Sequence, residues 1–216
     1  MNECLEQIAR LTALTAVSGR ESACFDALRE QTAGLFDEIT TTPTGSFAGI
    51  IRCGRPDAPL VLLDAHIDEI GFVVTEICDG GFLRVAAVGG IDTRVLSASE
   101  VTVYGKEAVR GVFTSKPPHF MTAAERSAPL SMESILLDAG VCSRKDATEL
   151  LGLEPGLVAV PDVQFSYNDA TGLMLGKAFD CRLGCAGVVE VLRALKDETL
   201  CADVTAAFST QEEVGL

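Results

Sequence analysis

The sequence has few of the residue types that most often point to a function. It contains two histidines, no tryptophan and 6% aromatic residues among its 216 positions. Basic residues are also scarce, because 17 lysines and arginines stand against 31 acidic residues and give a net charge of −14. Such a balance repels phosphate backbones and anionic lipids. We therefore expect neither nucleic-acid nor membrane partners, and the acidic surplus suits a host for cations.

Several motifs are missing as well. The eight cysteines form no Cys-x-x-Cys pair, so neither a zinc ribbon nor a thioredoxin-like site is expected. The N-terminus lacks a basic flank followed by an apolar core, and no run of about 18 uncharged apolar residues could span a bilayer. We therefore expect a cytoplasmic protein with reduced thiols. Without a Gly-x-Ser-x-Gly elbow, a nucleophilic serine has little support.

Both ends of the chain show alternating helix and strand patterns. Apolar spacing predicts a helix between Leu5 and Thr15, and Ser18 with Glu21 fits a Ser-x-x-Glu capping box for a second helix. The apolar run at 60–63 is typical of a fully buried strand. Further along, the patterns predict a strand at 47–52, a helix at 183–196 and a strand at 204–209.

The middle of the chain is richer in strands. Alternating segments predict strands at 72–77, 82–88, 101–104 and 108–113, followed by helices near 131–139 and at 144–151. We infer an α/β domain made of residues 1–68 and 162–216, which is interrupted by a β-rich insertion at 69–161.

One segment with chemical potential follows the strand at 60–63. His66 and Asp68 are two residues apart, so in an extended segment they face the same side. A neutral imidazole suits zinc or cobalt, and a carboxylate on its other nitrogen fixes its orientation. A structural histidine bonded to a nearby aspartate explains the pair equally well.

Two further acidic groups lie near the predicted second half of the domain. Asp180 precedes the helix at 183–196, where it could cap the helix or bridge two cations. Glu212 and Glu213 follow the last strand. In a metallohydrolase one such carboxylate binds metal and the other takes a proton from water, whereas a solvated acidic loop is the simpler interpretation.

The order and spacing of these segments resemble one family. They are similar to the dinuclear-metal aminopeptidases of the glutamyl-aminopeptidase and tetrahedral (TET) type, some of whose members are labelled FrvX or endoglucanase. The resemblance covers nearly all 216 residues, as an N-terminal portion of the family's chain. It includes the segments at 17–21, 88–90, 116–119 and 176–178.

The resemblance implies a mixed-sheet, zinc-peptidase-like catalytic domain that carries an inserted β-barrel-like dimerisation domain. The implied reaction is hydrolysis of the N-terminal residue of peptides with a free N-terminus, using two divalent metal ions, zinc or cobalt, with manganese also accepted. A homo-oligomer built from dimers up to a dodecamer is implied for the full-length protein. The resemblance implies that His66 binds one metal ion, that Asp68 orients His66 and that Asp180 bridges the two metal ions. It further implies that Glu212 is the general base and that Glu213 binds the other metal ion.

The chain departs from the family pattern at two places. Cys181 stands where the family usually has asparagine. The family also takes an aspartate and a histidine ligand from beyond its Glu-Glu-Val-Gly motif, whereas only Leu216 follows Gly215 here. We therefore expect the C-terminal part of the catalytic domain to be missing and these 216 residues alone to form an incomplete peptidase. His119 is interpreted as a loop residue and not as a substitute ligand.

Two other functions fit the same residues. One is a catalytically inactive truncated relative that acts as an assembly or regulatory subunit. The other is a different dinuclear-metal amidohydrolase, such as a deacetylase or a carboxypeptidase.

Overall fold

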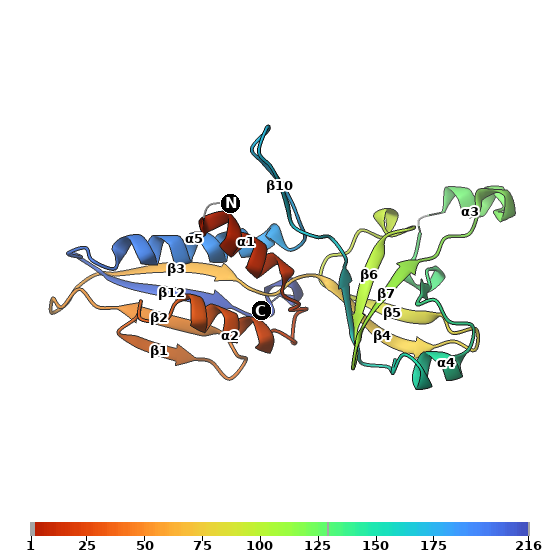
Figure 1. Ribbon diagram of the computed structural model, residues 1–216, viewed down its shortest axis with the longest axis horizontal. Helices are drawn as coiled ribbons and strands as arrows, with labels where there is room; N and C mark the ends of the chain where they lie inside the picture. Colours follow the sequence, from red (N-terminus) through yellow and green to blue (C-terminus); the bar gives the residue numbers. More distant parts are fainter. Residues whose placement is uncertain (1–2, 129, 216) are drawn as a thin grey trace. The chain divides into compact units, whose positions relative to one another are not determined.

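The computed structural model describes residues 3–128 and 130–215, so the terminal Leu216 lies outside the described residues. The chain divides into two compact units (Figure 1). One unit comprises the chain up to Glu69 and from Gln164 onward, and the other is Ile70–Val163. The mixed α/β fold with an inserted β-barrel agrees with the fold class predicted from the sequence.

The first unit is built on a four-stranded mixed sheet. The sheet has the order β1-β2-β12-β3, in which β12 is antiparallel to β2 and parallel to β3. The predicted helices and strands at both ends of the chain are present. The elements of this unit are α1 (Glu3–Ala13), α2 (Ser22–Gln31), β1 (Glu38–Thr41), β2 (Phe47–Ile51), β3 (Leu60–His66), β10 (Ser166–Asn168), β11 (Leu173–Leu175), α5 (Phe179–Leu195), β12 (Asp203–Ser209) and the 3₁₀ turn η4 (Glu212–Val214).

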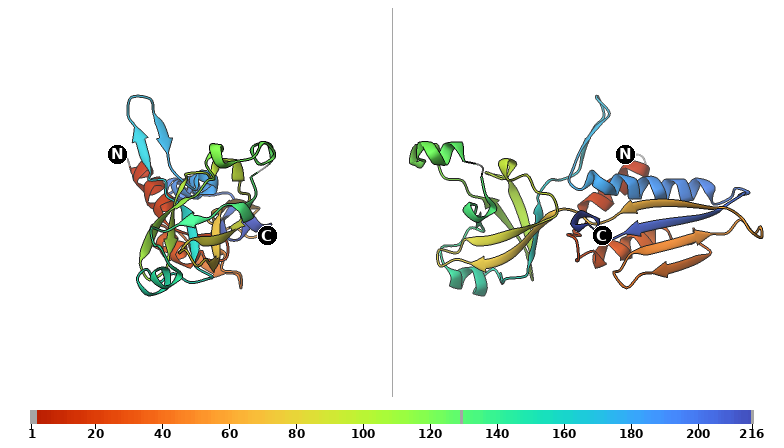
Figure 2. Two further views of the ribbon diagram at one scale, coloured as in Figure 1. Left: turned by 90° about the vertical axis from the view of Figure 1, so that its right-hand side faces the viewer. Right: turned by 180° about the vertical axis from the view of Figure 1, so that it is seen from behind.

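One face of this sheet holds the hydrophobic core. Along β12 every second side chain is buried, and Phe208 stacks on Phe47 of β2 with ring centroids 5.8 Å apart. Helix α5 runs along β3 in Figure 1 and in the right-hand view of Figure 2, and it buries Val189 and Leu192 completely. Burying these apolar surfaces supplies the main driving force for this unit.

The prediction of a fully buried strand at 60–63 was wrong. Leu60 and Leu62 keep 64% and 61% of their surface exposed, whereas Ala65, on the side that faces α5, is buried. Within the described residues β3 is an edge strand whose only neighbour is β12. A continuous apolar run identifies a strand but does not establish that both of its faces are covered.

A two-stranded hairpin leaves the sheet region before α5. Strands β10 and β11 pair antiparallel, with Ser166 opposite Leu175, and the hairpin projects away from the helices in Figures 1 and 2. Leu173 and Leu175 are exposed on it.

The second unit is a closed barrel with strand order β4-β5-β8-β7-β6-β9. Closure pairs every strand on both sides and leaves no free sheet edge. Phe72 and Phe113 meet inside it with ring centroids 4.8 Å apart. Its elements are β4 (Gly71–Ile77), β5 (Leu83–Val88), η1 (Thr93–Val95), β6 (Glu100–Tyr104), β7 (Ala108–Phe113), η2 (Pro118–Phe120), α3 (Ala123–Ser127), η3 (Met132–Ser134), β8 (Leu137–Asp138), α4 (Arg144–Glu149) and β9 (Val158–Pro161).

The four predicted strands of the insertion and its helix at 144–151 are confirmed. The helix predicted near 131–139 was wrong, because that segment forms the short turn η3 and strand β8. Leu137 of β8 pairs with both Leu83 and Phe113, so completing the barrel outweighs the local helical pattern. None of the described helices is long and apolar enough to cross a bilayer.

Candidate metal centre

Three chain segments converge at one end of the mixed sheet. Strands β3 and β12 are parallel and end side by side, with His66 opposite Ser209 and the Ile67 amide donating to the Ser209 carbonyl at 2.9 Å. The loops that follow carry Asp68 and the two glutamates, and α5 begins beside them. Open α/β sheets commonly place their sites at the carboxyl ends of parallel strands, and the described residues follow that rule.

His66 contacts carboxylates on both sides of its ring. Its Nε2 lies 3.0 Å from Asp180 Oδ1 and 3.7 Å from Glu212 Oε2. Its Nδ1 lies 3.2 Å from the backbone oxygen of Asp68 and 3.4 Å from Asp68 Oδ1. His66 is buried, with 8% of its surface exposed.

These contacts test whether the residues fit a cation. A neutral imidazole carries one proton, so one of its two nitrogens would face carboxylate or carbonyl oxygens without a hydrogen between them. A proton on Nδ1, donated to the Asp68 carbonyl, leaves the Nε2 lone pair directed at Asp180 and Glu212. A cation between Nε2 and these oxygens removes the repulsion. Nitrogen and carboxylate donors together suit zinc, cobalt or manganese, so the residues fit a divalent metal.

Asp68 is the fully buried centre of a hydrogen-bond network. Its carboxylate accepts from the backbone amides of Glu212 and Glu213 at 3.2 and 3.1 Å and from the Ser18 hydroxyl at 2.6 Å. These donors satisfy a buried charge that would otherwise be costly. They also fix the loop that carries both glutamates relative to His66.

The two glutamates lie on the 3₁₀ turn η4 and are not equivalent. The Glu212 side chain is 55% exposed. Burial raises the pKa of Glu213; the nearby carboxylates of Asp180, Asp68 and Glu212 act in the same direction, and His66 opposes them. Gln211 just before the turn adopts a left-handed backbone with φ of 61°. Such a conformation turns the chain so that both carboxylates can serve one site.

Asp180 does not behave as a helix cap. The backbone at Asp180 and Cys181 is non-helical, so the regular part of α5 starts after them, and the peptide bond joining them is cis. The Asp180 side chain is 89% exposed, and its oxygen faces His66. The Asp180 carboxylate is directed at His66 and, among the described residues, accepts no hydrogen bond from an amide of α5, so the capping role is not supported.

A buried cluster of charged residues connects the segments that carry the candidate site. Glu69 is bonded to Lys177 at 2.7 Å and to Arg182 at 2.9 Å, and it also accepts from the Ala16 amide. Arg182 is fully buried and donates to backbone carbonyls at Leu11, Leu14 and Ile67. The cluster ties the segment that follows β3 to the one that begins α5.

The hydrogen bonds and ion pairs around the candidate site were not predicted from the sequence. The predicted capping box was wrong, because Ser18 donates to Asp68 and Glu21 Oε1 accepts from the Gly19 and Gln211 amides. Helix α2 has Glu21 at its N-cap without a side-chain cap bond. The charged residues next to the site, Glu69, Lys177 and Arg182, were the available signal, because charges inside apolar stretches need partners. His119, by contrast, lies in the barrel unit, where its ring contacts Phe120.

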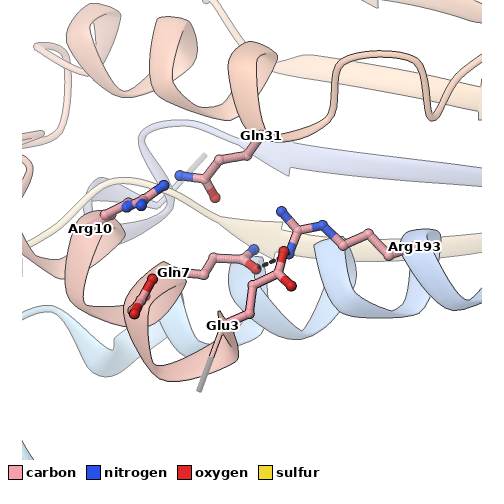
Figure 3. Close-up of a pocket in the computed structure, with 6 residues that line it drawn as sticks. Glu3, Gln7, Arg10, Gln31 and Arg193 are labelled. Atoms are coloured by element: carbon pink, nitrogen blue, oxygen red, sulfur yellow. Dashed lines mark hydrogen bonds and ion pairs between the residues drawn. The ribbon is translucent and has the colours of Figure 1, made fainter. Parts of the chain in front are cut away.

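A separate cavity lies among α1, α2 and α5. Its volume is about 470 Å³, and Figure 3 shows Arg193 directed toward Glu3 and Gln7 at its wall. Within the described part, Gln7 Nε2 and Gln31 Oε1 have no hydrogen-bond partner. None of the five predicted site residues lines this cavity, so it is distinct from the convergence around His66.

Comparisons with known proteins agree with the geometry. A model of the family described as M42 glutamyl aminopeptidase matches residues 45–216. FrvX of Escherichia coli (strain K12) is 33% identical over 214 residues, which cover 98% of this chain and 58% of FrvX. The structure of a TET aminopeptidase from the marine sediment archaeon Thaumarchaeota archaeon SCGC AB-539-E09 superposes with a TM-score of 0.91 at 31% identity, covering 99% of this chain and 60% of that one.

A third relative is described together with its assembly. The Pyrococcus horikoshii TET1 peptidase, described as able to assemble into a tetrahedron or a large octahedral shell, superposes with a TM-score of 0.83 at 29% identity. The match covers 99% of this chain and 62% of that protein. This chain thus spans about three fifths of the length of the relatives it matches.

Proposed function

The chain belongs to the M42 glutamyl aminopeptidase family, and from that premise we propose that its protein is a dinuclear-metal aminopeptidase that removes the N-terminal residue from peptides. The observation that carries the proposal is the convergence of one imidazole and several carboxylates at the ends of β3 and β12. This donor set fits divalent metals, and the proposed peptide hydrolysis needs both metal ligands and a general base.

Each residue has a proposed task. Asp180, which projects toward solvent beside His66, would be shared by the two cations, and His66 and Glu213 would each hold one of them. Bound divalent cations supply Lewis-acid polarisation of a carbonyl and acidify water. Asp68 holds the His66 ring and the glutamate loop in place.

Glu212 is the proposed general base. It is the more open of the two glutamates, and its Oε2 lies 3.7 Å from His66 Nε2, which places it at the metal-facing side of the ring. A carboxylate there takes the proton from the attacking water and returns it to the amine that leaves.

The proposal is tested on the complete product of the reading frame that contains this chain. Metal is removed with a chelator, zinc or cobalt is restored, and release of the N-terminal residue is measured with matched peptides that have a free or an acetylated N-terminus. We expect activity to return with metal and only toward the free N-terminus. Equal cleavage of the acetylated peptide, or removal of the acetyl group, would favour another amidohydrolase.

The inserted barrel is proposed to mediate self-association, because the P. horikoshii relative is described as assembling into large shells. Deleting the barrel unit should lower the number of subunits per particle, obtained from light scattering. An unchanged number of subunits would show that the barrel is not needed for assembly. The cytoplasmic location stays a prediction.

A further inference from the structure

Cys181 lies within the candidate metal centre, next to Asp180 in the chain. Among the described residues, the donor atoms of His66, Asp180 and Cys181 all lie within 4.8 Å of one another. The three come from two elements that are far apart in sequence, the end of β3 and the start of α5. They form a mixed nitrogen, oxygen and sulfur donor set.

We propose that the Cys181 thiolate is itself a metal ligand of this centre, together with His66 and Asp180. The inference rests on the proposed metal-dependent function and adds a sulfur donor to it. A tetrahedral zinc ion with bonds of about 2.0–2.3 Å holds its donor atoms about 3.3–3.8 Å apart. Small side-chain rotations bring three atoms that already lie within 4.8 Å to that spacing.

The helix below the sulfur leaves room for it. A Cβ added to Gly184 would meet Cys181 Sγ at 2.5 Å and the Ala65 Cβ at 3.2 Å. A side chain at position 184 would therefore occupy the space that the sulfur now fills. Two small residues, Gly184 and Ala65, let the thiol lie between α5 and the end of β3, close to the His66 ring.

The neighbouring cysteine differs in its surroundings. Cys185 is fully buried, donates to the His66 backbone carbonyl at 3.2 Å, and burial raises the pKa of its thiol. Cys181 is only partly buried and lies beside the histidine and aspartate donors. Of the two thiols, Cys181 is therefore the one placed to meet a cation.

Binding of a divalent cation by the Cys181 thiol requires no oxidant. The S–H bond of Cys181 breaks, its proton passes to solvent, and the sulfur lone pair forms the bond to the divalent cation. A thiolate donor shifts the preference of the centre toward softer ions such as zinc and away from manganese.

The test uses the complete product of the reading frame that contains this chain, freed of metal and titrated with Co²⁺. We expect a thiolate-to-cobalt charge-transfer absorption in the near ultraviolet that saturates together with metal binding. Cys181→Ser should remove this band and weaken zinc binding by about tenfold or more. The matched control Cys201→Ser changes an exposed thiol and should leave both unchanged. Far-ultraviolet circular dichroism establishes that each variant is folded.

A second readout does not depend on any variant. Zinc should slow alkylation of Cys181 in the wild-type chain, followed by mass spectrometry, while the exposed Cys142 and Cys201 react at unchanged rates. Cobalt binding without a charge-transfer band and without protection of Cys181 would overturn the thiolate ligand and leave the metal-dependent function standing. Failure of the wild-type chain to bind cobalt or zinc at all would overturn the thiolate ligand and count against the metal centre itself.

Discussion

Glu69 and Lys177 form a buried ion pair, in which the lysine Nζ lies 2.8 and 2.7 Å from the two carboxylate oxygens. Glu69 directly follows Asp68, and Lys177 comes three residues before Asp180. The pair therefore joins the two segments that carry the candidate site, and Arg182 adds a second cation to the same carboxylate.

Glu69→Gln should destabilise the protein strongly. The change leaves the buried cations Lys177 and Arg182 without their shared carboxylate, and breaking a buried pair in this way typically costs about 3–5 kcal/mol. Urea unfolding measures the loss. Glu149→Gln, which removes an exposed pair with Lys145, is the control and should cost about 1 kcal/mol or less. Equal effects in both variants would show that the cluster adds little to stability.

Glu212→Gln and Glu213→Gln should separate catalysis from metal binding in the complete protein. The first variant keeps the shape of the side chain but cannot take a proton, so turnover should fall about 100- to 10,000-fold with metal content nearly unchanged. The second should lose metal first. Activity and metal content are measured on the same samples. Parallel loss of both in Glu212→Gln would mean that the base has been assigned to the wrong residue.

Gly184→Ala and Gly187→Ala should have opposite effects on stability. Both glycines lie in α5, where alanine is intrinsically favoured by about 0.5–1 kcal/mol. A Cβ at Gly187 meets nothing within 4 Å, so that variant should be stabilised. A Cβ at Gly184 meets the Cys181 sulfur at 2.5 Å, so that variant should be destabilised in thermal unfolding.

A double variant locates the clash. Cys181→Ala removes the sulfur and should restore part of the stability lost in Gly184→Ala. If the two effects simply add, the strain at position 184 does not come from Cys181.

Asp203 should contribute to the acid sensitivity of the first unit. Its pKa is lowered from 3.8, first by the Cys53 backbone amide and then by Arg52, so the folded state favours the charged carboxylate. This contribution is therefore present above the unfolded value and is lost as the pH falls through the lower folded value. In urea unfolding, Asp203→Asn should be less stable than wild type at pH 7 and approach it near pH 3. The exposed Asp197→Asn is the control and should show no such convergence.

Much of the fold follows from local patterns. Alternating segments predicted the barrel strands, and helical spacing predicted α1 and α5, because these periods reflect which face of an element meets the core. The prediction of a helix near 131–139 was wrong because strand β8 is short and depends on pairing with Leu83 and Phe113. Such pairing is a property of the barrel and not of the segment.

The sequence by itself indicated the α/β class and the inserted β-rich segment, and it supplied the five residues that stay a prediction for the site. Only the tertiary structure decided how they are supported: Ser18 bonds to Asp68 and not to its own helix, and Glu69 joins Lys177 and Arg182. It also decided that the outer side of β3 is open within the described residues and that Cys181 lies beside His66. The physical reason is the separation along the chain of the residues that interact. Periodicity is set by neighbours within a few residues, whereas these hydrogen bonds and ion pairs join groups that only the folded chain brings together.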